Sequence, residues 1–503
     1  MKYLKTPSSK QIKNALGWSF AENAVNRGLS MLVRLYLVTL LAPEAFGLVA
    51  MAIVFIAFLQ VMGEMGMTAA LIQRKAENLT ETHWRTGFTV SFSISALGWI
   101  VILFVLAPFA AFFYGEGELR LILPVLGIGL VTDSLAVVQR AKLTKALRFK
   151  ALCLASAIAT LISSALGIYM AYHGYGVWAL VAKTLSNSIL LSSFLSISAG
   201  WIPRFGFAKA AFKDLFSFGA YVFAEQMLTF LMGNIDYLMI GKLVGRAGLG
   251  AYTLAFTLTD IFRHQIMGVF NRVFFPVYAN VQDDKKKAAD YFLKVVKYSS
   301  LIIVPVMAIM ILDAEGIIFY AFGKSWRESI FPLQVLALSC IIHSIGGTSS
   351  TFIRAAGHAR LAMALNFASV VFLAVPAIIF GSIIAGLNGA ACGVLAHRVG
   401  GRLLTLIFVF RLFPIRWAGI LRVLRPTAGI CLVIVVVNRA LVFFLPESLT
   451  TFLIRIIIEM LTLAVFLPIF LPELKAAVAR TDSNVLSNRN GGDTLCVKSD
   501  QTE

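Results

Sequence analysis

The sequence predicts an all-α polytopic membrane protein with about 14 transmembrane helices, and three observations carry this prediction. The chain of 503 residues has a mean hydropathy of +0.84 and is 59% hydrophobic. Only 14% of its residues are charged, against about 25% in soluble domains. Apolar stretches long enough to cross a hydrocarbon core about 30 Å thick recur along the chain. Together these features exclude a soluble globular enzyme.

Fourteen apolar stretches bounded by polar, glycine or proline residues are predicted to be helices. The ninth contains Pro305, Asp313 and Glu315, so we expect it to be kinked or to end early. The stretches span residues 14–41, 45–71, 87–113, 119–139, 151–172, 175–200, 215–241, 248–271, 292–322, 330–353, 361–385, 387–410, 423–445 and 449–471.

Lysine and arginine alternate between the connecting segments, as the positive-inside rule requires. Of the 44 basic residues, 31 lie in segments on one side of the predicted membrane, five on the other and eight inside predicted spans. The first stretch is too long and too polar for a cleaved signal peptide. We therefore expect it to be retained, with both termini in the cytoplasm.

An internal repeat divides the chain. The segment Phe20-Ala21-Glu22-Asn23 recurs as Phe223-Ala224-Glu225-Gln226, and Phe46-Gly47 falls on Leu249-Gly250 at the same offset of 203. Duplicated bundles are common in transporters. The sequence therefore predicts an N-lobe over 1–213 with helices 1–6, a C-lobe over 214–411 with helices 7–12, helices 13 and 14 over 412–471, and a disordered cytoplasmic tail over 472–503.

The net charge of +19 does not indicate nucleic-acid binding, because the chain has no compact basic domain and no basic stripe interleaved with aromatic residues. The charge instead marks membrane orientation. The five cysteines are far apart and show neither a disulfide framework nor metal-ligand spacing.

Polar residues in the first helix predict an aqueous cavity. They are spaced by four, three and four positions, which places them on one face, and two further polar residues flank that face. Such a helix is not expected to face lipid. The alternative is that Arg34 extends to the membrane surface and that Glu22 pairs with Asn26. The residues are Asn23, Arg27, Ser30 and Arg34, flanked by Glu22 and Asn26.

Carboxylates inside predicted spans are candidates for coupling to an ion gradient. Glu225 repeats the position of Glu22, and Asp236 follows on the same helix. These acids could instead be structural partners of Arg27 or Lys183. Asp260 has Arg263 at i+3, where an internal ion pair is favoured over a coupling role. Two more acids, Glu64 and Asp133, lie near helix ends and are capping or gate candidates.

Basic residues outnumber acids in the spans that carry the candidates, which favours an anionic ligand because arginine binds phosphate and carboxylate in a bidentate manner. A site for cationic drugs would be dominated by carboxylates and aromatic faces. At Arg402, extension of the side chain to the membrane surface is a sufficient explanation. In the last helix, Arg455 is expected to pair with Glu459 at i+4. The candidate cavity residues are Asn23, Asn26, Arg27, Arg34, Lys183, Arg263 and Arg398.

Enzymatic functions are disfavoured. The chain has no metalloprotease, serine-hydrolase or Walker A motif. Its predicted outer loops are only a few residues long, whereas membrane polymerases and ligases of exported glycans commonly need a substantial outer loop. No nucleotide-binding domain is encoded, and no cofactor or metal is expected.

Short motifs in both halves resemble a known family. They match the polysaccharide-exporter and Wzx-type O-antigen flippase branch of the multidrug/oligosaccharidyl-lipid/polysaccharide (MOP) superfamily, most closely the colanic-acid and teichuronic-acid exporters. The motifs are Ala45-Phe46-Gly47-Leu48, Gly63-Glu64-Met65-Gly66-Met67 and Leu71-Ile72-Gln73-Arg74 in the first half, and Asp236-Tyr237-Leu238-Met239-Ile240-Gly241-Lys242, Gly248-Leu249-Gly250-Ala251-Tyr252 and Phe275-Pro276 in the second.

The resemblance implies a flippase of the bacterial inner membrane that moves a polyprenyl-pyrophosphate-linked oligosaccharide by alternating access of two lobes. It implies coupling to a proton or sodium gradient, contact with membrane lipid, and a glycan polymerase and chain-length regulator as partners. Arg27 and Arg34 match the first-helix arginines of the related lipid II flippases. Thr257 stands near the place of a further family arginine, and Glu64 stands where aspartate is common.

Three other functions stay open from the sequence. A multidrug or cation antiporter of the same superfamily would need binding dominated by carboxylates. A membrane enzyme such as a glycan polymerase would elongate glycan chains. A lipid scaffold without transport has no need for so many charges inside spans.

Overall fold

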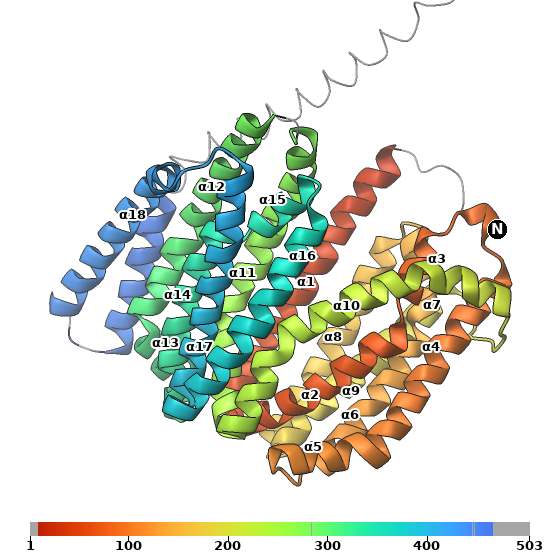
Figure 1. Cartoon of the computed structure of the whole chain (residues 1–503). Helices are drawn as coiled ribbons and strands as arrows, with labels where there is room; N and C mark the ends of the chain where they lie inside the picture. The colour runs from red at the N-terminus through yellow and green to blue at the C-terminus, as the bar shows by residue number, and fades with distance from the viewer. Residues whose placement is uncertain (1–8, 283, 445, 447, 466–503) are drawn as a thin grey trace, which may run out of the picture. The chain divides into compact units, whose positions relative to one another are not determined.

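The computed structural model describes residues 9–282, 284–444, 446 and 448–465, and within these ranges it consists of helices joined by turns and loops, without a strand (Figure 1). The all-α prediction is confirmed. The elements are α1 (Ser9–Leu40), α2 (Pro43–Glu64), α3 (Met67–Gln73), η1 (Ala76–Asn78), α4 (Glu81–Val101), η2 (Ile102–Leu106), α5 (Ala107–Tyr114), α6 (Leu119–Leu135), α7 (Val137–Lys145), α8 (Phe149–Tyr172), α9 (Val177–Ala199), α10 (Lys209–Val244), α11 (Arg246–Asn280), α12 (Lys285–Leu312), α13 (Ala314–Phe322), η3 (Lys324–Ser329), α14 (Ile330–Gly346), α15 (Ser349–Ala355), α16 (Ala359–Ser369), η4 (Val370–Ala374), α17 (Val375–Leu412), α18 (Trp417–Phe444) and a helix over 449–465.

Each of the 14 predicted apolar stretches is mainly helical where the structure describes it, with short breaks such as those at residues 65–66 and 347–348. Within the described residues, ten helices are long and apolar enough to cross a membrane. One of these ten covers both the eleventh and twelfth stretches. The first, eighth and fourteenth stretches correspond to α1, α11 and the helix over 449–465, which do not meet the same limits of length and apolarity.

Interruptions in the helices occur at identifiable residues. Both π-helical segments, η2 and η4, stand directly before a helix with proline in its first turn, Pro108 or Pro376. Proline lacks an N–H and clashes with the preceding turn, so a locally wider turn accommodates it. The predicted ninth helix is divided at Asp313, between α12 and α13. Within α17, Ala385 and Gly386 leave the helical conformation, which separates the eleventh and twelfth stretches.

The chain forms two compact units, each described by itself. Unit 1 comprises Met1–Leu254, Phe322–Glu328 and Ser382–Ala390, and unit 2 comprises Ala255–Ala321, Ser329–Gly381 and Ala391–Glu503. In unit 1, α8 packs against α1 and α9, α6 packs against α2 and α9, and α2 also packs against α10 (Figure 1). In unit 2, α12 packs against α14 and α18. The lobe boundaries expected from the repeat stay a prediction, and the tail over 472–503 lies outside the described residues.

Two repeat-related glycines of unit 1 lie where α2 and α11 approach most closely. A Cβ at Gly47 would lie 1.8 Å from the carbonyl oxygen of Arg246, and a Cβ at Gly250 would lie 1.9 Å from that of Pro43. Only glycine allows such contact, and small residues at helix crossings are typical of membrane bundles. Each glycine therefore meets the start of the helix that carries the other.

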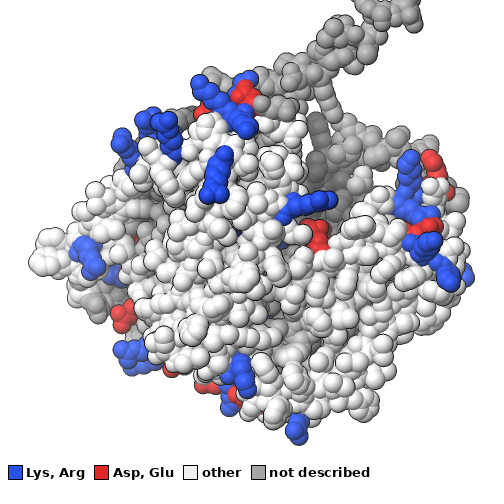
Figure 2. Space-filling view, viewed as in Figure 1, with Lys and Arg blue, Asp and Glu red and all other residues white. Residues whose placement is uncertain are grey.

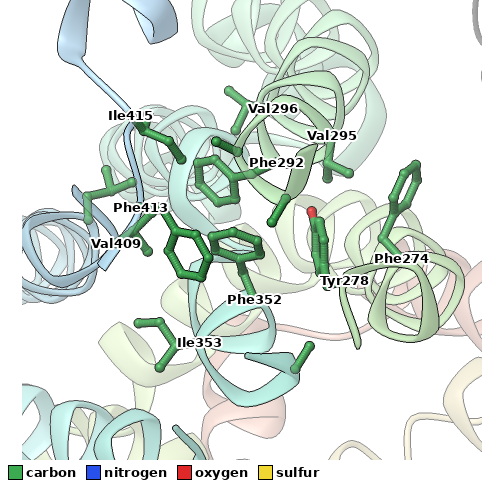
Figure 3. Close-up of a cluster of buried hydrophobic side chains, with 14 of the residues drawn as sticks. Phe274, Tyr278, Phe292, Val295, Val296, Phe352, Ile353, Val409, Phe413 and Ile415 are labelled. Carbon is green, nitrogen blue, oxygen red and sulfur yellow. The ribbon is translucent and has the colours of Figure 1, made fainter. Parts of the chain in front are cut away.

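Unit 2 has an aromatic core, shown in Figure 3. The ring of Phe352 lies 4.4 Å from that of Phe413, 4.8 Å from Tyr278 and 5.1 Å from Phe292, measured between centroids. All four side chains are buried. Such offset and edge-on ring pairs add stability beyond the burial of their area, so this core holds together α11, α12, α15 and the end of α17.

Candidate functional site

Unit 1 contains a cavity of about 360 Å³ with a polar wall. Most of its polar groups come from α2, α6, α7 and α9, and Thr68 of α3 and Ser95 of α4 add two hydroxyl groups. Its lining includes Gln60, Glu64, Asp133, Arg140, Thr184, Asn187 and Ser188, among apolar residues such as Ile53, Leu126 and Leu130.

Asp133 is the most tightly held acid in this cavity. Its Oδ1 accepts a hydrogen bond from Ser188 Oγ at 2.5 Å, and its Oδ2 accepts one from Gln60 Nε2 at 3.1 Å. The positive charge of Arg140 also acts on it. The sequence treated Asp133 and Glu64 only as capping or gate candidates. Their position inside apolar stretches was the signal that they line a cavity.

Glu22 belongs to the same charge network. It is half-buried on α1 and interacts electrostatically with Arg140, which also acts on Asp133. Arg140 therefore serves two carboxylates from different helices. The helices predicted over 119–139 and 151–172 leave Arg140 in a connecting segment, so its role was missed, because the contact depends on how α1 and α7 fold together.

The other first-helix candidates have separate surroundings. Asn26 Nδ2 donates to Ser156 Oγ on α8 at 2.6 Å, so Asn26 is tied to α8. Arg27 is exposed. The side chain of Asn23 lies outside the described residues.

Arg34 and Lys183 form a cationic pair in unit 1. Both are half-buried, one on α1 and one on α9, and their charges repel. Lys183 packs closely against α8 because Gly167 of that helix has no side chain. A Cβ at Gly167 would lie 2.8 Å from Lys183 Cβ. Among the described residues, neither cation forms an ion pair within 4.0 Å. Two adjacent cations without a carboxylate are suited to an anionic group.

The two candidate coupling acids of α10 differ from Glu22. Glu225, which repeats the position of Glu22, is exposed. Asp236 is buried, and its Oδ2 accepts a hydrogen bond from the hydroxyl of Tyr252 at 2.7 Å. Its Oδ1 accepts one from the backbone N–H of Tyr237 at 3.0 Å. The repeat thus places acids at related positions but not in related environments.

Unit 2 contains an arginine cluster formed by Arg263, Arg398 and Arg402, with Asp260 beside it. Arg263 Nε donates to Asp260 Oδ1 at 2.8 Å, which is the internal pair expected from the sequence. Arg398 Nη1 donates to Ser339 Oγ at 2.7 Å. The charges of Arg263 and Arg398 both act on Arg402.

This arginine cluster carries a net positive charge, because three guanidinium groups face one carboxylate. The guanidinium carbons of Arg263 and Arg398 lie 6.0 and 5.8 Å from the centroid of the Phe256 ring, so the ring orients both. Sequence reasoning ascribed Arg402 to extension toward the membrane surface. Its i,i+4 spacing from Arg398 on one helix was the signal that it joins the cluster.

The visible surface has a lower density of charged side chains than these two sites. Figure 2 shows that most of the visible face is uncharged, with few lysine, arginine, aspartate or glutamate side chains. Within the part of the chain that the structure describes, no three histidine, cysteine, aspartate or glutamate residues converge as metal ligands.

Three curated proteins named for polysaccharide biosynthesis are similar to this chain. The teichuronic acid biosynthesis protein TuaB of Bacillus subtilis is 28% identical over 310 residues, covering 61% of this chain and 63% of that protein. The lipopolysaccharide biosynthesis protein WzxC of Escherichia coli is 23% identical, covering 76% and 77%. The succinoglycan biosynthesis transport protein ExoT of Rhizobium meliloti is 24% identical, covering 66% and 67%.

Solved structures share the fold. The lipid II flippase MurJ in an inward closed conformation matches with a TM-score of 0.69 at 18% identity, covering 91% of this chain and 99% of that one. A multidrug resistance transporter of the MATE family of the MOP superfamily, in an inward-facing conformation, matches with a TM-score of 0.61 at 16% identity, covering 78% and 98%. The predicted membrane fold of this superfamily is confirmed.

Comparison of the chain with the sequence patterns of known families tests the family expected from the motifs. Residues 36–331, more than half of the chain, match the family described as polysaccharide biosynthesis protein. This range contains α2–α13, including the close contact at Gly47 and Gly250 and all the motifs that carry the resemblance. The chain therefore belongs to the polysaccharide biosynthesis protein family.

Proposed function

We propose that this protein is a flippase that moves a polyprenyl-pyrophosphate-linked oligosaccharide repeat unit across the bacterial inner membrane by alternating access. The observation that carries the proposal is that each unit has a group of cations among apolar helices in excess of nearby carboxylates. The relatives are named for three different polysaccharides, which fits recognition of a shared anionic group rather than of particular sugars.

The cations have the chemistry to bind a pyrophosphate. In unit 1, Arg34 and Lys183 supply two charges that are not neutralised within 4.0 Å, and the exposed Arg27 adds a third on the same helix. In unit 2, the arginine cluster supplies planar guanidinium groups, which bind phosphate oxygens in a bidentate manner. We assign these residues to the substrate, with Asn23 and Asn26 in a supporting role.

Coupling to a proton or sodium gradient is assigned to Glu22. It shares Arg140 with Asp133, so a change in its charge alters the balance of the whole network. Glu225, Asp236 and Asp260 are weaker candidates, because the first is exposed and the others are held by Tyr252 and Arg263.

The cellular setting follows from the same proposal. We place the chain in the inner membrane with both termini in the cytoplasm, on the asymmetry of its basic residues. Its two lobes are proposed at 1–213 and 214–411. A glycan polymerase and a chain-length regulator are the partners that would act on the translocated unit, and nucleic acid is not a partner.

Analysis of lipid extracts from a deletion strain tests the proposal. We expect complete polyprenyl-pyrophosphate oligosaccharides to accumulate on the cytoplasmic face, and the wild-type gene to clear them. A chain with Arg34→Ala and Lys183→Ala should reach the membrane in normal amount but should not clear them. An intact surface glycan without accumulation in the deletion strain would contradict the flippase function.

The second candidate is a multidrug or cation antiporter. The carboxylates of the unit 1 cavity, Glu64 and Asp133, are the observation that favours it. Ion-dependent efflux of cationic drugs from cells that express the chain would support the antiporter. We expect no such efflux, because the cations of both units oppose a cationic substrate.

A further inference from the structure

A second buried polar group in unit 2 lies on helices other than those of the arginine cluster. Asp313 stands between α12 and α13, Asn438 lies on α18, and Arg455 and Glu459 lie on the helix over 449–465. Asp313 is 1% exposed, Asn438 3% and Glu459 0%. These four residues, which we term the carboxyl-pair cluster, have no part in the proposed substrate or coupling sites.

The two carboxyl groups of this cluster touch each other. They lie within hydrogen-bonding range. Asn438 Nδ2 donates to both, at 3.1 Å to Asp313 Oδ2 and at 2.7 Å to Glu459 Oε1. Arg455 pairs with Asp313 and not with Glu459, so the i,i+4 pair expected from the sequence is wrong. The second oxygen of Glu459, Oε2, is buried and receives no hydrogen bond.

The charges in the cluster do not balance if both acids are ionised. Two carboxylates would then face one guanidinium, leaving a net negative charge sealed from solvent beside an apolar contact. The neighbouring charged residues Glu315 and Arg439 are exposed and do not compensate it. Two carboxyl groups in contact cannot both ionise readily, and such pairs hold a shared proton.

We propose that Asp313 and Glu459 form a proton-binding site. One proton resides on Glu459 Oε2 and forms a hydrogen bond to the carboxyl group of Asp313, which pairs with Arg455. This arrangement gives the unpaired oxygen Oε2 a hydrogen bond and leaves the cluster electrically neutral. It also agrees with Asn438 as donor to the remaining oxygens of both acids.

The proton links pH to the packing of the helix over 449–465. That helix inserts Phe452 against Gly316, where a Cβ would lie 2.5 Å from Phe452 Cε2, and Ile456 packs on a buried apolar cluster that includes Ile309 and Ile434. Loss of the proton leaves two like charges in contact at the same junction. We therefore expect alkaline pH to loosen this helix from α12 and α18.

Infrared spectroscopy of the purified full-length protein in lipid nanodiscs tests the site. At neutral pH, we expect the protonated-carboxyl C=O band of Glu459→Gln to be smaller than that of wild type by the intensity of one group. Glu315→Gln removes an exposed glutamate close to Asp313 and should leave the band unchanged. An equal band in wild type and Glu459→Gln would overturn the proposal.

Thermal unfolding gives an independent readout. The melting temperature of wild type should fall from neutral to alkaline pH by more than that of Glu459→Gln, whose amide mimics the protonated acid. Should Glu459→Gln fail to fold, Asp313→Asn serves instead. Removing the acidic partner lets Glu459 ionise toward Arg455, so the infrared band should again lose one group. Retention of the full band in Asp313→Asn would also contradict a shared proton.

Discussion

The cavity of unit 1 and the arginine cluster of unit 2 have opposite charge balances. At the cavity, Asp133 shares one arginine, Arg140, with Glu22, and Glu64 lies in the same lining. In the cluster, Arg263, Arg398 and Arg402 face one aspartate, Asp260. The cavity therefore favours cations and the arginine cluster favours anions, while Arg34 and Lys183 form a separate cationic pair in unit 1. We infer that duplication preserved the helical framework while the ionisable groups diverged.

The glycine crossing shows what the repeat preserved. Gly47 and Gly250 are related by the offset of 203, and each lies against the start of the other's helix. Glu22 and Glu225 share the same offset, but the first is half-buried and the second exposed. A close backbone contact restricts the residue type at a position more strongly than an ion pair does, because a charged side chain can find another partner.

The largest expected effect concerns the aromatic core of unit 2, which is tightly packed, in contrast to the cavity of unit 1. Phe352→Ala should lower the free energy of unfolding by about 3–5 kcal/mol, because it removes a ring packed against three others. Denaturant unfolding of the purified protein in detergent measures this change. Phe372→Ala, which removes a phenylalanine that is 72% exposed, is the matched control. Equal losses in both variants would show that the core is not closed.

Removing charge from the arginine cluster tests whether unit 2 binds the anion. Arg398→Ala with Arg402→Ala should reduce export about 100-fold or more, since each hydrogen bond to a charged group contributes roughly 1.5–3 kcal/mol. Accumulation of lipid-linked repeat units in a complemented deletion strain measures the loss. Arg439→Ala removes an exposed arginine of the same unit and should export normally. Normal export by the double variant would remove unit 2 from substrate binding.

A pair of glutamate substitutions tests the asymmetry of the repeat. Glu22→Gln should slow gradient-driven export about tenfold, which corresponds to about 1.4 kcal/mol and lies within the usual range of coupling energies. Glu225→Gln should change it little, because that side chain is exposed. Transport in proteoliposomes with imposed proton and sodium gradients measures both. Equal effects of the two variants would mean that the repeat positions are functionally equivalent.

The smallest effect is expected at Asp284, which lies outside the unit 1 cavity and the arginine cluster and serves as a reference for the other charge substitutions. Hydrogen bonds from the backbone and side chain of Lys287 lower the pKa of Asp284, which caps α12. Its contribution is present above its unfolded pKa and is lost as the pH falls through the lower folded pKa. Asp284→Asn keeps a capping side chain and should only flatten the acid limb of the melting temperature against pH. If Asp284→Asn slowed gradient-driven export more than Glu22→Gln does, the assignment of the functional charges to the interiors of the two units would be contradicted.

Much of the fold could be predicted from local sequence. Apolar stretches of sufficient length form helices because no other arrangement satisfies the backbone inside a membrane. Interruptions were predictable where the cause is local, as at Asp313 and Gly386. Family motifs such as Gly47 and Gly250 were visible as well, although the close crossing that they permit was not.

The sites were predicted only in part. Helical spacing places Asp260 beside Arg263, and this pair forms in the structure. The same spacing relates Arg398 and Arg402, but the sequence interpretation missed that they share a cluster. The spacing did not show that Arg34 meets Lys183 or that Arg140 serves Glu22, because these contacts join helices distant in sequence.

The sequence by itself determined the helices, the family and the excess of cations within them, since these depend on composition and on spacing along one helix. Tertiary structure alone decided which charges on different helices meet. It brought Arg455 to Asp313 rather than to Glu459, and it exposed Glu225 while half-burying Glu22. The physical reason is that the energy of a buried charge depends on its neighbours across helices, and a one-dimensional pattern does not contain their distances.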